Sequence, residues 1–584
     1  MNNIKNLKYS EILKTNTKLG SNINSNSYNI SVLSNTIINQ IKEILEYVLR
    51  NENINANVRI GDYDNIIQDS IKYKNSNIVI IFWELCNIID GLQYKIELFD
   101  DEQFEAILKK TKSEIDLTLK NLNKTSLVLF NKFTSMPFSS SNIRKSTLEK
   151  LADQLNQYLE GKIQANVKLV ALEKVIASVR VEKSLDLRYY YSSKALYTID
   201  FFKAYTEYVK PYIMSANGKA KKALIFDCDN TLWKGILGED GFDNIEMSSR
   251  TKDGAIFSEI QGIALDLNKQ GILIGLCSKN NPKDVDEVIN SHPDMKLREE
   301  HITIKKSNWS DKVTNLRQIA KELNIGLDSL VFIDDSSFEV NLIKEQLPEI
   351  TVLQVPERLY EYPKMLRENT GLFYNLSLTE EDKKKIGMYK QYVKRENVRK
   401  EFTNIDDYLT SLELKMTIYE DNETIIPRMS QMSQKTNQFN LTTKRYTEGD
   451  IRNFILSNWT KVFAFSISDK FGDSGVTGLC IINIDTTNKT ADIDSFLMSC
   501  RIIGRNIEYS FMDYLMDFLK YNKIENVTAK YTTTYKNEQV KEFYDKCSFS
   551  LIEFYDKTKK YELVVENYKP KKLKYIEINY GKQN

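Results

Sequence analysis

Short apolar runs alternate with amphipathic segments over the first 370 residues of this chain. The runs are rich in Val, Ile and Leu, which is typical of strands buried on both faces of a parallel sheet. The segments between them carry apolar residues at helical spacing on one face. In residues 1–215 the strand-like runs are 28–33, 77–82, 126–130 and 167–172, and the helix-like segments include 35–50 and 101–122. This alternation predicts a small parallel α/β domain.

The same alternation, with stronger signals, continues through residues 216–370 after a predicted linker at 216–218. Its strand-like runs end at Phe226, Cys277 and Ile333, and a helix is expected near 257–269. The pattern therefore predicts a second parallel α/β domain.

Residues 371–413 are highly charged, and residues 414–584 form a third zone. A Thr-Glu-Glu-Asp capping box at Thr379–Asp382 predicts a helix that runs towards Lys400, which we interpret as a solvated connector. The third zone mixes helices with strand-like runs such as 491–498 and 526–531. We expect an α/β multidomain protein whose last domain is α+β.

Composition narrows the class of protein without identifying it. The 584 residues are too many for one core, and the net charge of +1 gives no general attraction to nucleic acid or to an anionic membrane. The six cysteines lack CxxC pairs, which argues against a zinc site and a disulfide framework. No run of about 18 apolar residues occurs and the first residues resemble no export signal, so we expect a cytoplasmic protein.

Two aspartates one residue apart follow the apolar run that ends at Phe226. Open α/β sheets bind their ligands at the carboxyl ends of their strands, which is where Asp227 and Asp229 fall. One carboxylate can attack an electrophile while the other handles the proton of the leaving group, and both can border a cation. Thr231 completes an acid-x-acid-x-Thr pattern.

Three later groups of polar residues also lie at predicted strand ends or helix starts, where they can complete a site with Asp227 and Asp229. Ser278 follows the second strand just before a helix that starts near Pro282, so its hydroxyl and the helix N-terminus can hold a phosphoryl group. Lys312 lies on the first turn of another predicted helix and offers a compact cation. The third strand ends in Asp334-Asp335, which completes an oxygen-lined site suited to Mg²⁺.

This ordered set resembles the four motifs of the haloacid dehalogenase (HAD) superfamily of phosphoryl-transfer enzymes. The resemblance implies a Rossmann-like domain in which Asp227 is the nucleophile and Asp229 is the acid and base. It also implies that Ser278 and Lys312 bind the phosphoryl group and that Thr231 orients the motif loop. The implied metal site holds Mg²⁺ with Asp334 and Asp335 beside Asp227 and Asp229.

The sequence between the first two motifs narrows this resemblance. Only 51 positions separate Asp227 from Ser278, which leaves little room for a cap domain. A site without a cap suits a substrate tethered to a macromolecule, or it needs another domain to cover it. The segment Asp229–Gly241 resembles the FkbH-like branch of the superfamily, as do 434–443 and 499–505. Members of that branch take a glyceryl unit from 1,3-bisphosphoglycerate and load it on an acyl carrier protein in polyketide and related biosynthesis.

Covalent loading through a thioester needs a cysteine. Some members of the branch carry one four residues before the nucleophile, where this chain has Ala223. Cys228, between the two aspartates, and Cys277, beside Ser278, are the candidate thiols. The alternative is that both are small apolar residues in buried positions.

The third zone resembles the Gcn5-related N-acetyltransferase (GNAT) fold. Its strand 491–498 leads into an Arg-x-x-Gly loop and a helix, and Gly at such a place lets backbone N–H groups approach a pyrophosphate or a pantetheine. We interpret it as a domain that recognises the phosphopantetheine arm of a carrier, with an active acyltransferase and a plain packing module as alternatives. The implied binding residues are Arg501, Gly504, Arg505, Asn537 and Tyr544.

The first domain resembles a degenerate SGNH-hydrolase-like or flavodoxin-like unit. A hydrolase of that type has Gly-Asp-Ser after its first strand and a late His, whereas this chain has Leu33-Ser34-Asn35 and no His before His292. We therefore expect a structural or partner-binding domain. Three functions remain open: carrier loading with a phosphorylated three-carbon acid, stand-alone phosphomonoester hydrolysis, and a carrier-protein-binding scaffold with an idle site.

Overall fold

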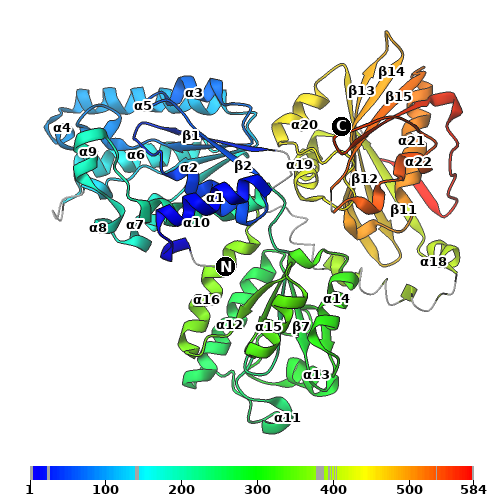
Figure 1. Ribbon diagram of the computed structural model, residues 1–584. Helices are drawn as coiled ribbons and strands as arrows, with labels where there is room; N and C mark the ends of the chain where they lie inside the picture. The colour runs from blue at the N-terminus through cyan, green and yellow to red at the C-terminus, as the bar shows by residue number, and fades with distance from the viewer. Residues whose placement is uncertain are drawn as a thin grey trace. The chain divides into compact units, whose positions relative to one another are not determined.

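A computed structural model describes residues 4–22, 27–138, 144–376, 387–391, 395, 398–399, 402, 404–534 and 536–581 (Figure 1). The chain divides into two compact units. Unit 1 holds residues 1–216 with 447–450, and unit 2 holds residues 217–446 with 451–584. The capping box predicted at Thr379–Asp382 lies outside the described residues.

Unit 1 contains a five-stranded sheet in which every strand pair is parallel. The strand order β2-β1-β3-β4-β5 is the order of flavodoxin-like doubly wound folds. The strands are β1 (Tyr28–Ser34), β2 (Ala56–Ile60), β3 (Ile78–Phe82), β4 (Leu127–Asn131) and β5 (Val167–Val170). All five side chains of β3 and of β4 are buried, which explains the unbroken apolar sequence of β3 and of residues 127–130 in β4. The predicted parallel α/β architecture is confirmed.

Helices of unit 1 cover the sheet, and one apolar core contains residues of α3, α5 and α6. The helices of at least seven residues are α1 (Tyr9–Asn22), α2 (Ile41–Asn51), α3 (Ile66–Lys72), α5 (Asp101–Asn121), α6 (Thr147–Gly161), α7 (Leu172–Val179), α9 (Leu187–Ser193) and α10 (Ile199–Ala216). Capping boxes at Asp100 and Ser146 begin α5 and α6.

Two element boundaries in unit 1 differ from the sequence prediction. The helix expected from residue 35 begins only at Ile41, because the Asn35 side chain donates to the backbone oxygen of Glu84 and accepts from its backbone N–H. These hydrogen bonds tie the loop after β1 to the loop after β3. The strand expected over 167–172 ends at Val170, and α7 begins at Leu172.

Unit 2 begins with a second five-stranded sheet whose strand pairs are all parallel. Its order is β10-β9-β6-β7-β8, so β6 lies at the centre. The strands are β6 (Ala223–Phe226), β7 (Leu273–Ser278), β8 (Ile302–Ser307), β9 (Leu330–Asp334) and β10 (Thr351–Gln354). The helices that follow these strands are α12 (Lys252–Lys269), α13 (Pro282–Ser291), α14 (Lys312–Glu322), α15 (Ser337–Gln346) and α16 (Tyr362–Asn369).

Alternate residues of β6 explain why helices cover both faces of this sheet. Leu224 and Phe226 belong to an apolar core with α12, α13 and α16, whereas Ala223 and Ile225 belong to a second core with α14 and α15. Between β6 and β7 the chain forms only α12 and the four-residue α11 (Leu237–Asp240). The predicted Rossmann-like domain with a minimal cap is therefore confirmed.

The remainder of unit 2 contains an eight-stranded mixed sheet in the order β16-β17-β15-β14-β13-β12-β11-β18. Its strand pairs are antiparallel except β14 with β15 and β11 with β18. The strands are β11 (Leu414–Glu420), β12 (Thr460–Asp469), β13 (Gly472–Asp485), β14 (Thr490–Met498), β15 (Asn526–Thr532), β16 (Ser550–Tyr555), β17 (Thr558–Val564) and β18 (Ile576–Tyr580). The helices in this region are α18 (Ile405–Ser411), α19 (Ile426–Lys435), α20 (Glu448–Ile455), whose first three residues belong to unit 1, α21 (Ile507–Tyr521) and α22 (Phe543–Lys546).

A segment of the chain fills the gap where β14 and β15 diverge. The two strands pair only from Thr490–Ile493 to Asn526–Ala529. Beyond that point residues 439–441 bond to both strands: the Leu441 N–H donates to Phe496, the Met498 N–H donates to Phe439, and the Thr532 N–H donates to Leu441. The gap therefore contains backbone of the same chain.

The charged segment that we expected to be a solvated connector is buried at Arg395. The Arg395 side chain is 2% exposed and pairs with Asp469, whose carboxylate is fully buried. An Nη2 to Oδ1 hydrogen bond of 2.7 Å joins them, and Arg505 approaches the same carboxylate at 3.3 Å. The prediction of a solvated segment is wrong at this residue, because its charge is neutralised inside the fold.

Asp469→Asn tests this buried cluster. The amide keeps the shape of the carboxylate but removes the negative charge that pairs with the buried Arg395 and Arg505 guanidinium groups, so we expect the free energy of unfolding to fall by about 3–5 kcal/mol. Urea denaturation measures the change. The control is Asp517→Asn on the exposed side of α21, which should change stability by less than about 0.5 kcal/mol. Equal stabilities of the two variants would contradict the pairing.

Candidate functional site

Three of the predicted acidic residues meet at the carboxyl edge of the β6 sheet. Asp227 directly follows β6, and Asp334 ends β9, the strand that pairs with β6. One oxygen from each of Asp227, Asp334 and Asp335 lies within 4.8 Å of the others. Hard carboxylate oxygens are the ligands that Mg²⁺ prefers, so this group fits a divalent cation.

Lys312 joins two of these carboxylates. Its Nζ lies 3.0 Å from Asp227 Oδ1 and 2.6 Å from Asp334 Oδ2. All three side chains are at least nine-tenths buried, so water screens these charges little. Asp311 begins α14 by accepting from the Thr314 N–H at 2.7 Å, which fixes Lys312 in the first turn.

The environment of Asp227 raises the pKa of its carboxyl group to about 7. Burial is the largest cause and Asp334 adds to it, while Lys312 and a hydrogen bond from Ser278 oppose the rise. Burial also raises the pKa of Asp335, together with the neighbouring Asp334. Burial lowers the pKa of the Lys312 ammonium, but the two aspartates outweigh it and hold the pKa above its usual value.

Asp229 lies beside this group with its carboxylate held by three donors. Asp229 Oδ1 accepts from Trp233 Nε1 and from the Leu237 N–H, both at 3.0 Å. Asp229 Oδ2 accepts from Asn280 Nδ2 at 2.8 Å. Asp229 is outside the group of three carboxylates, so its predicted place among the metal ligands stays a prediction. A carboxylate in fixed orientation suits proton transfer.

Ser278 and Thr231 complete the predicted set. Ser278 ends β7, is 1% exposed, and accepts from Asn280 Nδ2 at 3.0 Å. Thr231 is fully buried, and its backbone oxygen accepts from the Tyr362 hydroxyl at 3.1 Å. Within the described ranges the Thr231 Oγ1 has no hydrogen-bond partner, so no hydrogen bond of this hydroxyl supports the predicted role of Thr231 in orienting the motif loop.

Sequence reasoning missed the residues that orient Asp229. Asn280 is two positions after Ser278, and Trp233 is four positions after Asp229. Trp233 lies in the loop after β6 and Asn280 in the loop after β7, where no hydrophobic periodicity predicts the direction of a side chain. For Trp233 the sequence did contain a signal, because this residue belongs to the motif Asp229–Gly241.

Neither predicted thiol is exposed. Cys228 and Cys277 are fully buried, and burial raises the pKa of both thiols. The Cys277 Sγ lies 3.9 Å from the backbone oxygen of Lys312. Because the reactive form is the thiolate and a buried thiol resists ionisation, the structure argues against the thioester prediction for these two residues.

The residues predicted to hold pantetheine make contacts inside the protein. The Asn537 side chain donates to the backbone oxygens of Asn440 and Thr532, so it secures the segment that fills the gap beyond β14. The Arg505 guanidinium binds Asp469 and the backbone oxygen of Arg501.

The other three pantetheine candidates do not gather at one place either. The Tyr544 hydroxyl is buried, and burial raises its pKa far above the usual value. Gly504 adopts a positive φ of 86° beside open space. Only Arg501 of the five predicted residues lines the cavity described below. Asn537, Arg505 and Tyr544 are buried, so the pantetheine set stays a prediction.

Comparison with solved structures shows a shared fold. The N-terminal part of the Bacteroides fragilis protein BF1531, described as containing a phosphatase domain complexed with Mg, is 24% identical with a TM-score of 0.54. The match covers 64% of this chain and all of that one. Two further solved structures each match 26% of this chain with a TM-score of 0.21. The Escherichia coli ribosomal-protein-S18-alanine N-acetyltransferase is 11% identical over 94% of its length, and Thermoplasma volcanium Ard1 is 17% identical over 97%.

No protein-family model and no curated protein matches this chain. Among the residues that the structure describes, no helix is both long and apolar enough to cross a membrane.

Lys312→Met tests the electrostatic centre of the site. Removing the ammonium leaves two buried carboxylates without a counter-charge, so we expect the metal-free protein to lose about 3–5 kcal/mol of unfolding free energy. Urea denaturation in the presence of a chelator measures this loss. Lys321→Met on the exposed face of α14 is the matched control, with an expected change below about 0.5 kcal/mol. The site is misassigned if Lys312→Met is as stable as its control.

Proposed function

We propose that unit 2 catalyses phosphoryl transfer through an aspartyl-phosphate at Asp227, as a Mg²⁺-dependent enzyme of the HAD type. The observation that carries this proposal is the buried arrangement of Lys312 between Asp227 and Asp334, with Asp335 beside them. The fold likeness to BF1531, whose description names a phosphatase domain complexed with Mg, supports it.

The residues of the site divide the reaction between them. An Asp227 oxygen attacks the phosphorus atom, and the bond from phosphorus to the leaving oxygen breaks. Asp229 gives its proton to that oxygen and later removes a proton from the water that hydrolyses the phosphoaspartate. The Lys312 ammonium balances the negative charge that develops on the phosphoryl oxygens.

Asp227, Asp334 and Asp335 would hold the metal. When bound, Mg²⁺ supplies a fixed positive charge for the phosphoryl oxygens. Ser278 would bind the phosphoryl group from the adjacent strand β7, and its hydrogen bond to Asp227 supports this role.

For the substrate, we infer a phosphorylated three-carbon acid such as 1,3-bisphosphoglycerate, with the thiol of an acyl carrier protein as acceptor of the glyceryl unit. The thiol would attack the acyl carbon and the bond to the 1-phosphate would break, so that phosphate leaves, while phosphoryl transfer through Asp227 would remove the 3-phosphate. The connection between β6 and β7 supports an acceptor of macromolecular size, because it contains α11 and α12 and no inserted domain. A site without its own lid admits a tethered group more readily than it secludes a small metabolite. The extended motif at Asp229–Gly241 agrees with this acceptor.

Asp227→Asn should abolish phosphate release while leaving the fold intact. The amide has the shape of the carboxylate but is not a nucleophile, so we expect the rate to fall by at least about 10³-fold. Phosphate release from acetyl phosphate and from 1,3-bisphosphoglycerate with Mg²⁺ measures the rate. Asp294→Asn, at an exposed position, should retain full activity, and a chelator should abolish phosphate release by the unmodified protein. Turnover by Asp227→Asn would exclude Asp227 as the nucleophile.

The acceptor is tested with a holo-acyl carrier protein. Incubation with 1,3-bisphosphoglycerate, Mg²⁺ and the protein should add the mass of one glyceryl unit to the carrier, detected by intact-protein mass spectrometry. The apo-carrier, which lacks the phosphopantetheine thiol, is the control and should keep its mass. Phosphate release without a mass change would favour a stand-alone phosphomonoester hydrolase. No phosphate release from either phosphorylated compound would favour the scaffold.

A further inference from the structure

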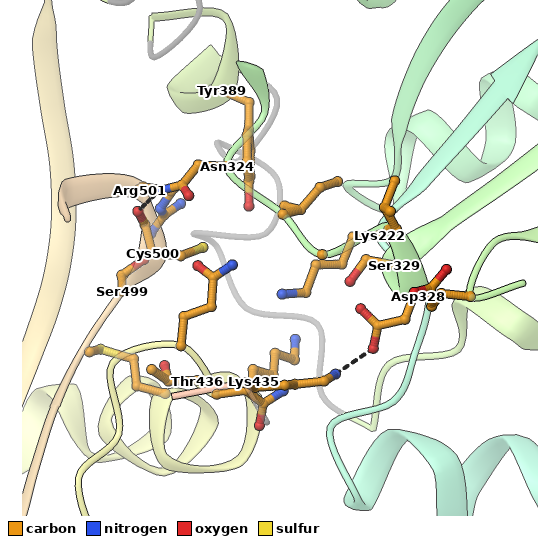
Figure 2. Close-up of a pocket in the computed structure, with 18 of the residues that line it drawn as sticks. Lys222, Asn324, Asp328, Ser329, Tyr389, Lys435, Thr436, Ser499, Cys500 and Arg501 are labelled. Carbon is orange, nitrogen blue, oxygen red and sulfur yellow. Dashed lines mark hydrogen bonds and ion pairs between the residues drawn. The ribbon is translucent and has the colours of Figure 1, made fainter. Parts of the chain in front are cut away.

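A cavity of about 410 Å³ lies in unit 2 at the edge of the β6 sheet opposite to Asp227 (Figure 2). Lys222 directly precedes β6 and residues 324–329 precede β9, and all of them line the cavity. Asp227 and Asp334 lie at the other ends of the same two strands. The cavity is therefore separate from the proposed phosphoryl-transfer site, and its volume falls within the range of about 300–1,000 Å³ that small-molecule sites occupy.

Positive charge dominates the cavity wall. Five cationic residues line it against two acidic ones, although the whole chain has a net charge of only +1. The acid Asp328 is already paired with Lys536 at 2.5 Å. The cations are Lys222, Arg428, Lys435, Arg501 and Lys536, and the acids are Asp328 and Glu349. An anionic ligand would meet a complementary surface here.

Arg501 is a buried cation with unused donors. Arg501 is 8% exposed, and its Nη1 contacts the Met388 sulfur at 2.9 Å. In the described part of the chain no carboxylate lies within 4 Å of its guanidinium, and Nε has no hydrogen-bond partner. A buried guanidinium without a counter-charge is costly, so an anion bound in the cavity would relieve this cost.

Lys222 faces Arg501 across the cavity. Figure 2 shows the Lys222 side chain directed inward from one wall and Arg501 on the opposite wall. No carboxylate of a described residue lies within 4 Å of the Lys222 ammonium. The Ser499 and Thr436 side chains also line the cavity and can add hydroxyl donors. Two cations and hydroxyl groups around one void are suited to a phosphate group.

Cys500 gives the cavity a thiol on its wall. It is the one cysteine of the six that is not buried, and Figure 2 shows it between Ser499 and Arg501. Asn324 donates to the Cys500 backbone oxygen and so joins this wall to the loop before β9. The segments 434–443 and 499–505, which the sequence set apart, both contribute to the lining.

We propose that this cavity is a second ligand site, which binds a phosphate-bearing small molecule through Lys222 and Arg501 and places it against Cys500. The site goes beyond the proposed phosphoryl transfer, because no residue of the Asp227 group lines it. Two kinds of ligand could carry this phosphate group: a free phosphorylated acid, or the 4′-phosphopantetheine arm of a carrier.

The accessible thiol provides the measurement. We expect iodoacetamide to alkylate Cys500 at least about tenfold faster than the five buried cysteines of the full-length protein, as followed by peptide mass spectrometry. Saturating 3-phosphoglycerate or 4′-phosphopantetheine should slow alkylation of Cys500 at least about fivefold. Glycerate and pantetheine, which lack the phosphate, are the matched control compounds and should not protect. The compound that protects identifies the source of the phosphate.

Lys222→Gln should raise the probe concentration needed for half-protection by about tenfold, whereas Lys344→Gln, at an exposed position on α15, should leave it unchanged. Asp227→Asn should retain protection, so failure of the phosphoryl-transfer proposal is distinguishable from failure of this one. Calorimetric titration with both phosphorylated probes provides an independent measurement. Absence of both protection and binding heat, or equal protection by pantetheine and 4′-phosphopantetheine, overturns the proposal.

Discussion

The buried ammonium of Lys312 is the constraint on which the site in unit 2 depends. Asp227 and Asp334 end neighbouring parallel strands, so the fold brings their carboxylates together in an environment that disfavours charge. Without Lys312, burial and mutual repulsion would favour protonation of one of them. The lysine between them keeps negative oxygens available for a cation and for attack. Helix α14 therefore positions the ammonium group of the site, because Lys312 is its first residue.

The sequence predicted this group because its members occupy strand ends and helix starts. A four-residue strand that is buried throughout leaves Asp227 at a carboxyl edge, and Asp311 fixes the start of α14 one residue before Lys312. Such positions follow from hydrophobic pattern and capping chemistry, which are local. The contacts of Asp229 did not follow, because Trp233 and Asn280 reach it from loops whose backbone path depends on tertiary packing.

In the mixed sheet, too, contacts between residues far apart in the sequence could not be predicted from local sequence patterns. Two strands of this sheet, β14 and β15, and the amphipathic helix α21 follow from their sequence patterns, yet Asn537, Arg505 and Tyr544, which the resemblance implied for pantetheine, are buried. Asn537 holds Asn440, a residue 97 positions away in the sequence, and this contact closes the gap beyond β14. Local sequence cannot reveal such a contact, because the inserted segment has no strand-like pattern of its own. Arg395 was misjudged for the same reason, since its partner Asp469 is 74 positions away.

The two ends of β6 now bear different chemistry. Lys222 and Asp227 are five residues apart, which at about 3.3 Å per residue separates their backbones by roughly 17 Å. The strand between them is hydrogen-bonded on both sides, to β7 and to β9, and its four side chains are fully buried. Such a strand is stiff, because any shift along it would break two ladders and two apolar cores together. A ligand in the cavity therefore has little means to displace Asp227 through β6, and we expect the two sites to bind their ligands independently.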